Sequence, residues 1–119
     1  MNDDTGADSM RMILAIIQPF KVEEVKQALH ALAGLTGATF SAARGFGRGR
    51  QDAPLSDEAI KGTTERVRVE VVVPAAMENI VVEAVQKAAH TGNRGDGKIF
   101  VLSVQRGVRI STGEEGAEV

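Results

Sequence analysis

The order in which hydrophobic periods follow one another constrains the fold of this chain more than any other feature. Two segments have apolar residues at helical spacing, and each lies between segments with the short apolar runs or the alternation typical of strands. The predicted strands are 12–17, 36–44, 66–73 and 99–104, and the predicted helices are 21–33 and 77–88. This order predicts an α+β, ferredoxin-like βαββαβ fold with an antiparallel sheet and both helices on one face.

The segments outside this pattern set the expected domain limits. We expect one domain over residues 11–113, preceded by a disordered tail at 1–10 and followed by a flexible tail at 114–119, with a possible short fifth strand at 108–111. Residues 47–65 have no sustained period and form a long loop between the second and third strands. A loop of that length within a compact domain usually has a function.

The overall charge and the absence of some residue types exclude several classes of protein. A net charge of −2 argues against a nucleic-acid-binding surface. The chain has no apolar run near the roughly 20 residues that a membrane span needs, so direct membrane insertion is not expected. Without cysteine the chain has no disulfides, and a cytoplasmic location is expected. The face of the sheet away from the helices carries several valines, which predicts self-association.

The glycine-rich stretch from Thr91 to Lys98 is the strongest candidate for chemistry. Gly92 to Lys98 matches the phosphate-loop pattern G-x-x-x-x-G-K, and glycine backbones can form an anion-binding nest beside a lysine. Ile99 stands where a magnesium-binding Ser or Thr is required, and the loop runs from a helix into a strand. We therefore expect a phosphate site outside the P-loop NTPase class, or else a connector with solvated charges. Asp96 is expected to hold the turn through a side-chain-to-backbone bond.

Other charged clusters have competing interpretations. Every second residue over 45–50 is glycine, with Phe46, Arg48 and Arg50 between and after them, which indicates either a hinge or an anion contact. Arg66 and Glu70 share a strand face that is more often solvated than functional. Arg106 and Arg109 are spaced to clamp a phosphate or to lie in solvent. No nucleophile, general base or metal-ligand spacing accompanies these clusters, so an enzyme is not expected.

Four motifs in order resemble the PII signal-transduction proteins. They are Ile-Ile-Gln-Pro-Phe-Lys at 16–21, Gly-Phe-Gly-Arg at 45–48, Thr-Gly-x-x-Gly-Asp-Gly-Lys-Ile-Phe-Val at 91–101, and Arg-Ile-x-Thr-Gly-Glu at 109–114. In that family the long loop is the T-loop and the glycine-rich stretch is the B-loop. The resemblance implies a ferredoxin-like homotrimer with nucleotide sites in the clefts between subunits.

The resemblance also implies roles for individual residues. Residues around the adenine and ribose would be Gly37, Thr39, Glu70 and Val72. Residues at the T-loop base would be Gly45, Phe46, Gly47 and Arg48. Phosphate would be held by Gly95, Asp96, Gly97 and Lys98, with Arg109 reaching over from the neighbouring subunit.

Departures from the family pattern alter the expected ligands. Ser111 replaces an arginine, which removes a phosphate contact and favours ADP or AMP over ATP. Gly49 replaces the glutamine used with ATP and 2-oxoglutarate, and Arg66 replaces a lysine. The chain contains no tyrosine, so the family's tyrosine modification cannot occur, and Ser56 is only a weak phosphorylation candidate.

These departures suggest a divergent PII-like branch that is associated with carboxysome and inorganic-carbon genes. Such a protein would respond to adenine nucleotides and bicarbonate, with Arg48, Arg50 and Arg66 as the effector-anion site, and would regulate a target such as a membrane transporter. The alternative is a nitrogen-regulatory PII protein that senses ATP and 2-oxoglutarate and controls an ammonium transporter or an assimilation enzyme. A slow ATPase and a purely structural trimer are further alternatives.

Overall fold

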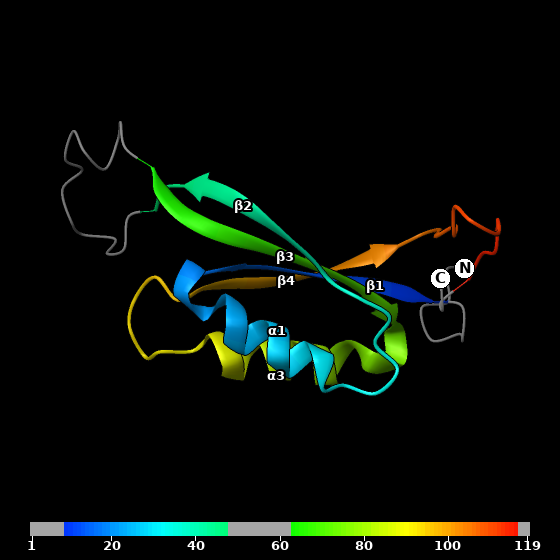
Figure 1. The fold of residues 1–119 in the computed structure, drawn as a ribbon, viewed down its shortest axis with the longest axis horizontal. Helices are drawn as coiled ribbons and strands as arrows, with labels where there is room; N and C mark the ends of the chain where they lie inside the picture. Colours follow the sequence, from blue (N-terminus) through cyan, green and yellow to red (C-terminus); the bar gives the residue numbers. More distant parts are fainter. Residues whose placement is uncertain (1–8, 48–62, 117–119) are drawn as a thin grey trace.

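Two α-helices lie on one face of a four-stranded antiparallel sheet in this computed structural model, which describes residues 9–47 and 63–116 (Figure 1). The strands are β1 (Met10–Ile17), β2 (Thr39–Gly45), β3 (Thr64–Pro74) and β4 (Gly97–Val104). The helices are α1 (Val22–His30) and α3 (Glu78–Ala89), each entered through a short 3₁₀ turn, η1 (Pro19–Lys21) or η2 (Ala75–Met77). The strand order β2-β3-β1-β4 confirms the predicted ferredoxin-like arrangement.

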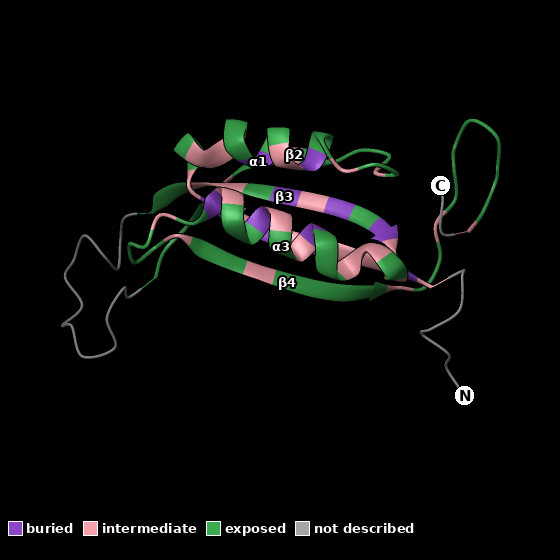
Figure 2. Cartoon of the chain, turned by 90° about the horizontal axis from the view of Figure 1, so that it is seen from below, coloured by how far each residue is buried: buried purple, intermediate pink, exposed green. Residues whose placement is uncertain are grey.

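The core lies between the helices and the two central strands (Figure 2). Alternate residues of β1 and β3 face the helices because successive side chains of a strand point to opposite faces. The buried residues that meet there are Ile13, Ala15, Ile17, Val69, Val71 and Val73 from the sheet, Val25 and Leu29 from α1, and Val81, Val85 and Ala89 from α3. Burying each valine or leucine contributes about 1.5–3 kcal/mol relative to exposure.

Neither helix of the described residues covers the opposite face of the sheet. Leu14 pairs in register with Glu70 on β3 and with Phe100 on β4, so these three side chains share that face. Phe100 is 50% exposed and Val72, on the same face of β3, is 40% exposed. This face therefore combines exposed apolar side chains with charged ones, which is compatible with the expected self-association. Self-association itself stays a prediction.

The N-terminal boundary and the first helix differ from their predicted limits. Met10 belongs to β1, and the backbone N–H of Ala75 donates to the carbonyl of Ser9 at 2.9 Å, so the predicted tail at 1–10 includes ordered residues. The first helix ends at His30 instead of residue 33. Gly34 follows with φ +88°, a turn conformation that favours glycine and carries the chain away from the helix.

The long loop and the C-terminal segment also differ from expectation. The predicted loop at 47–65 is too long at one end, because β3 already begins at Thr64. The predicted strand at 108–111 is absent from the described C-terminal segment, where Val108 makes one isolated bridge with Glu115. Glu115 also pairs with Arg106 at 2.7 Å, so the start of the predicted flexible tail at 114–119 has defined contacts. Arg48, Arg50 and Ser56 lie outside the described residues.

Candidate functional site

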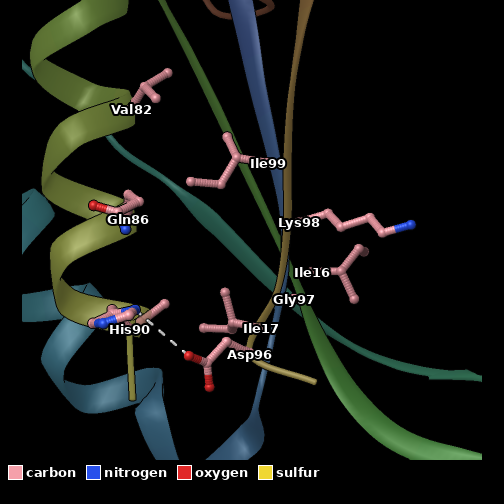
Figure 3. A pocket seen from close by; sticks show the side chains of 10 residues that line it. Ile16, Ile17, Val82, Gln86, His90, Asp96, Gly97, Lys98 and Ile99 are labelled. Atoms are coloured by element: carbon pink, nitrogen blue, oxygen red, sulfur yellow. Dashed lines mark ion pairs between the residues drawn. The ribbon is translucent and has the colours of Figure 1, made fainter. Parts of the chain in front are cut away.

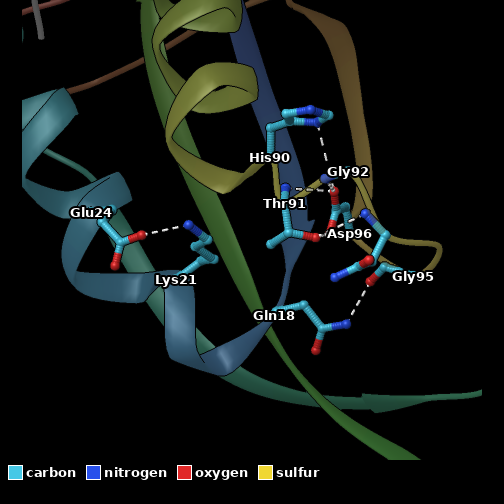
Figure 4. Close-up of polar contacts among 9 residues, drawn as sticks. Gln18, Lys21, Glu24, His90, Thr91, Gly92, Gly95 and Asp96 are labelled. Atoms are coloured by element: carbon cyan, nitrogen blue, oxygen red, sulfur yellow. Dashed lines mark hydrogen bonds and ion pairs between the residues drawn. The ribbon is translucent and has the colours of Figure 1, made fainter.

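The segment Thr91–Lys98, here called the glycine loop, connects α3 to β4 and is held by Asp96 (Figure 4). The Asp96 carboxylate accepts hydrogen bonds from the backbone N–H groups of Thr91 at 2.7 Å and Gly92 at 3.0 Å. The Thr91 hydroxyl donates to the same carboxylate, and the N–H of Asn93 donates to that hydroxyl oxygen at 3.1 Å. This is the side-chain-to-backbone role expected for Asp96.

The electrostatics of the glycine loop keep Asp96 ionised. The hydrogen bonds from the Thr91 side chain and then from its backbone hold the pKa of Asp96 below its ordinary value of 3.8. The imidazole of His90 lies 3.7 Å from the same carboxylate and adds a smaller effect in the same direction. Because its charge is satisfied within the loop, Asp96 anchors the loop rather than offering its oxygens to a ligand.

The glycine loop forms one wall of a cavity of about 630 Å³, here called the glycine-loop pocket. The other walls are the two ends of the long loop and the open face of the sheet. The residues that line it are Ile16, Gly45, Phe46, Gly47, Thr64, Arg66, Asn93, Gly95, Asp96, Gly97, Lys98 and Phe100. Arg66 and Lys98 give this cavity two cations, which suits an anionic ligand.

Gly97 explains how Lys98 comes to face this pocket. A Cβ at Gly97 would lie 1.8 Å from the carbonyl oxygen of Ile16, and its φ is +115°, so only glycine fits where β4 meets β1. The close approach fixes the register in which Lys98 pairs with Ile16. The Lys98 side chain then projects away from α3, whereas Ile99 points toward the helix (Figure 3).

A second cavity of about 540 Å³, here called the strand-end pocket, holds a different group of the predicted site residues. It is lined by Met12, Thr36, Gly37, Ala38, Thr39, Glu70, Val72 and Arg109. Thr39 and Glu70 are direct partners in the β2–β3 pairing. Arg109 lies 3.8 Å from the Glu114 carboxylate, within a turn closed by the Arg109 N–H to Glu114 carbonyl bond of 2.8 Å.

One chain does not bring Lys98 and Arg109 together. Lys98 is the second residue of β4, whereas Arg109 follows the end of that eight-residue strand. At a rise near 3.3 Å per residue, β4 separates its two ends by about 23 Å. The predicted residues of the glycine loop and the predicted adenine and ribose residues therefore line two separate cavities of the chain.

A third cavity of about 420 Å³ lies between α3 and β4 (Figure 3). It is lined mainly by apolar side chains such as Val82 and Ile99, with Gln86 and His90 on the helix side. The glycine loop borders it through Asp96 and Gly97, on the opposite side of β4 from the Lys98 ammonium. The sequence patterns did not indicate this cavity.

Gln18 was also not predicted as a site residue. Its side-chain amide donates to the carbonyl of Gly95 at 2.7 Å, across 77 residues of sequence (Figure 4). The sequence signal was its position inside the Ile16–Lys21 motif, where it had no assigned role.

The described residues offer no evident metal site or membrane span. Within 9–47 and 63–116, no group of three His, Asp or Glu side chains is placed to hold a metal ion. In the same two ranges, no helix has the length and apolar character needed to cross a bilayer.

Comparison with known proteins identifies the family. The family model described as "Nitrogen regulatory protein P-II" matches residues 10–114. The chain is 46% identical to a nitrogen regulatory protein P-II of Azospirillum brasilense and 44% identical to one of Rhodospirillum rubrum, in each case over 92% of this chain and 98% of the relative. A crystal structure of Arabidopsis thaliana PII bound to citrate matches 90% of this chain and 85% of its own with a TM-score of 0.74 and 32% identity. The chain therefore belongs to the nitrogen regulatory protein P-II family.

Proposed function

We propose that this chain is a nitrogen-regulatory PII protein that binds adenine nucleotides in the clefts between the subunits of a homotrimer. The observation that carries the proposal is the division of the site between two ends of the sheet. The glycine-loop pocket holds Lys98 and the strand-end pocket holds Arg109. A second copy that places its strand-end pocket against the glycine-loop pocket of the first would complete one site, and a closed ring would complete all of them.

The chemistry of each half suits one part of a nucleotide. Phosphate oxygens would meet Lys98 and the backbone of the glycine loop, with Arg109 of the neighbouring copy as a second cation. The exposed apolar surface of Val72 would contact the adenine, and the Glu70 carboxylate can accept from its amino group. Gly37 and Thr39 line the same pocket and would lie beside the ribose or base.

The comparisons favour nitrogen regulation over the inorganic-carbon role expected from the sequence. The relatives at 40–46% identity are all named as nitrogen regulatory proteins, and they match nearly the whole of their own length. The citrate in the Arabidopsis structure is a carboxylate bound to a PII protein. We propose 2-oxoglutarate, a dicarboxylate, as the effector of this chain, with Arg66 in the glycine-loop pocket as its cationic partner.

The expected preference for ADP or AMP over ATP remains part of the proposal. Ser111 stands in the exposed turn that carries Arg109, where a second arginine would face the outer phosphates. Without that guanidinium, the longest phosphate chain loses the most stabilisation. We propose that the long loop between Gly45 and Thr64 transmits the bound state to a target, such as a transporter or an assimilation enzyme.

Isothermal titration with ATP, ADP and AMP, each with and without 2-oxoglutarate or bicarbonate, tests this proposal. We expect nucleotide binding in every case, tighter for ADP or AMP, and a gain in nucleotide affinity with 2-oxoglutarate. A gain with bicarbonate alone would support the inorganic-carbon role instead. Absence of binding by all three nucleotides would refute the proposal, and steady ATP turnover would indicate an enzyme.

A further inference from the structure

The glycine loop receives a hydrogen bond from a part of the chain distant in sequence, at the junction between β1 and η1. Gln18 follows the buried Ile17 and precedes Pro19, and its carbonyl accepts from the N–H of Lys21 at 3.0 Å. The Gln18 backbone is fixed because it lies between the buried end of β1 and the 3₁₀ turn that begins at Pro19. Its side chain therefore extends from a rigid base (Figure 4).

The contact from Gln18 falls on a part of the loop to which the Asp96 carboxylate makes no hydrogen bond. Asp96 accepts from the N–H groups of Thr91 and Gly92, at the beginning of the loop. Gln18 donates at 2.7 Å to the carbonyl of Gly95, near the end of the loop. In a trans peptide the carbonyl and the following N–H point in opposite directions, so this bond also sets the direction of the Asp96 N–H.

Gly95 has a backbone conformation that its own side chain does not restrain. Its φ of +87° lies in the left-handed region, which glycine enters and leaves at little energetic cost. A Cβ at Gly95 would lie 3.5 Å from the Gln18 side-chain nitrogen and 3.7 Å from a guanidinium nitrogen of Arg66. The end of β1, the start of β3 and the glycine loop therefore converge on Gly95.

We infer that Gln18 is a positioning residue for the anion site: it holds the Gly95–Asp96 peptide in the orientation that binds phosphate. This inference rests on the proposed nucleotide binding. The hydrogen bond pre-orders the loop before a ligand arrives, which removes part of the ordering cost from binding. The amide does so without adding a charge beside Arg66 and Lys98, so those cations set the electrostatic selectivity of the pocket.

The variant Gln18→Met tests this inference because methionine keeps the length of the side chain and lacks the donor. Loss of one neutral hydrogen bond predicts an affinity for ADP that is lower by about 3- to 10-fold. Hydrogen exchange of the amides of Gly95, Asp96 and Gly97 should accelerate, with an unchanged melting temperature. Gln27→Met on the exposed side of α1 is the matched control, and it should alter neither quantity.

A second variant separates a specific hydrogen bond from side-chain packing. Gln18→Glu keeps the shape of the side chain but replaces the donor with an acceptor facing the Gly95 carbonyl, so it should accelerate loop exchange at least as much as Gln18→Met. If exchange in both variants equals that of the unmodified protein, the inference is wrong. If exchange accelerates while the unmodified protein binds no adenine nucleotide, Gln18 orders the loop and the proposed function fails instead.

Discussion

The Asp96 carboxylate lies 2.7 Å from the backbone N–H of Thr91, five residues earlier in the chain. This contact turns the glycine-rich connector into a closed loop, with the Gly92 N–H and the Thr91 hydroxyl bound to the same carboxylate. The shape of the loop therefore depends on one ionised side chain.

The first prediction concerns the pH dependence of that contact. Thr91 lowers the pKa of Asp96 in the folded protein, so the carboxylate contributes stability at pH values above its ordinary pKa of 3.8. That contribution is lost as the pH falls through the lower folded pKa. Asp96→Asn should therefore melt at a lower temperature than the unmodified protein at pH 7, and the difference should begin to shrink only below about pH 4, as the pH falls toward the lower folded pKa. Thermal melts of both proteins from pH 3 to 7 check this, and a difference that is as large at pH 3 as at pH 7 would contradict it.

The second prediction concerns Gly97, where β4 meets β1. Gly97→Ala would place a methyl group 1.8 Å from the Ile16 carbonyl oxygen at a φ of +115°. The strands must separate to relieve this clash, so unfolding should be easier by about 3 kcal/mol or more. Urea denaturation measures the difference. Gly45→Ala has open space around its Cβ position and serves as the control, with a change expected below about 1 kcal/mol.

The third prediction tests whether each nucleotide site takes Lys98 and Arg109 from different chains. Lys98→Ala and Arg109→Ala should each weaken ADP binding about 10-fold or more, since each removes a charge-assisted phosphate contact. Trimers reassembled from equal amounts of the two variants should recover full affinity at about a quarter of their sites, where two intact halves meet. Titration of the mixture measures that fraction. If no sites in the mixed trimers regain full affinity for ADP, the site would take both residues from the same chain.

The fourth prediction concerns the length of the phosphate chain. Ser111→Arg adds a guanidinium to the exposed turn beside Arg109. The affinity for ATP should rise by about 10-fold, with a smaller gain for AMP, because the added donor would reach the outer phosphates. Competition titrations of ATP against AMP measure the ratio. Ser111→Gln, which adds length without charge, is the control, and an equal gain for ATP and AMP would indicate general electrostatic attraction instead.

The hydrophobic periods were sufficient to predict the fold, but they left the ends of its elements uncertain. Val67, Val69 and Val71 alternate with Arg66, Arg68 and Glu70, and this period depends only on strand geometry. The extent of β4 was harder to predict, because Gly97 and Lys98 resemble loop residues until their pairing with Ile17 and Ile16 is known. A short strand was predicted at 108–111, where the structure has only an isolated bridge between Val108 and Glu115. Local β-propensity does not show whether a neighbouring strand is present for the segment to pair with.

The candidate site was predicted in part. The glycine loop, Lys98 and Arg109 stand out as motifs, and their spacing in the sequence was enough to propose an anion site. Gln18 was missed because its position in the Ile16–Lys21 motif does not indicate a contact with Gly95, 77 residues away.

By itself, the sequence determined the order of strands and helices, the core pattern and the residue types that suit a phosphate, because these follow from local period and side-chain chemistry. Only the tertiary structure decided which of those residues lie together. It placed Lys98 and Arg109 near opposite ends of β4, directed the Asp96 carboxylate into its own loop and brought Gln18 to Gly95. The physical reason is that strand pairing and chain reversal fix distances between residues that are far apart in sequence, and no local pattern encodes those distances.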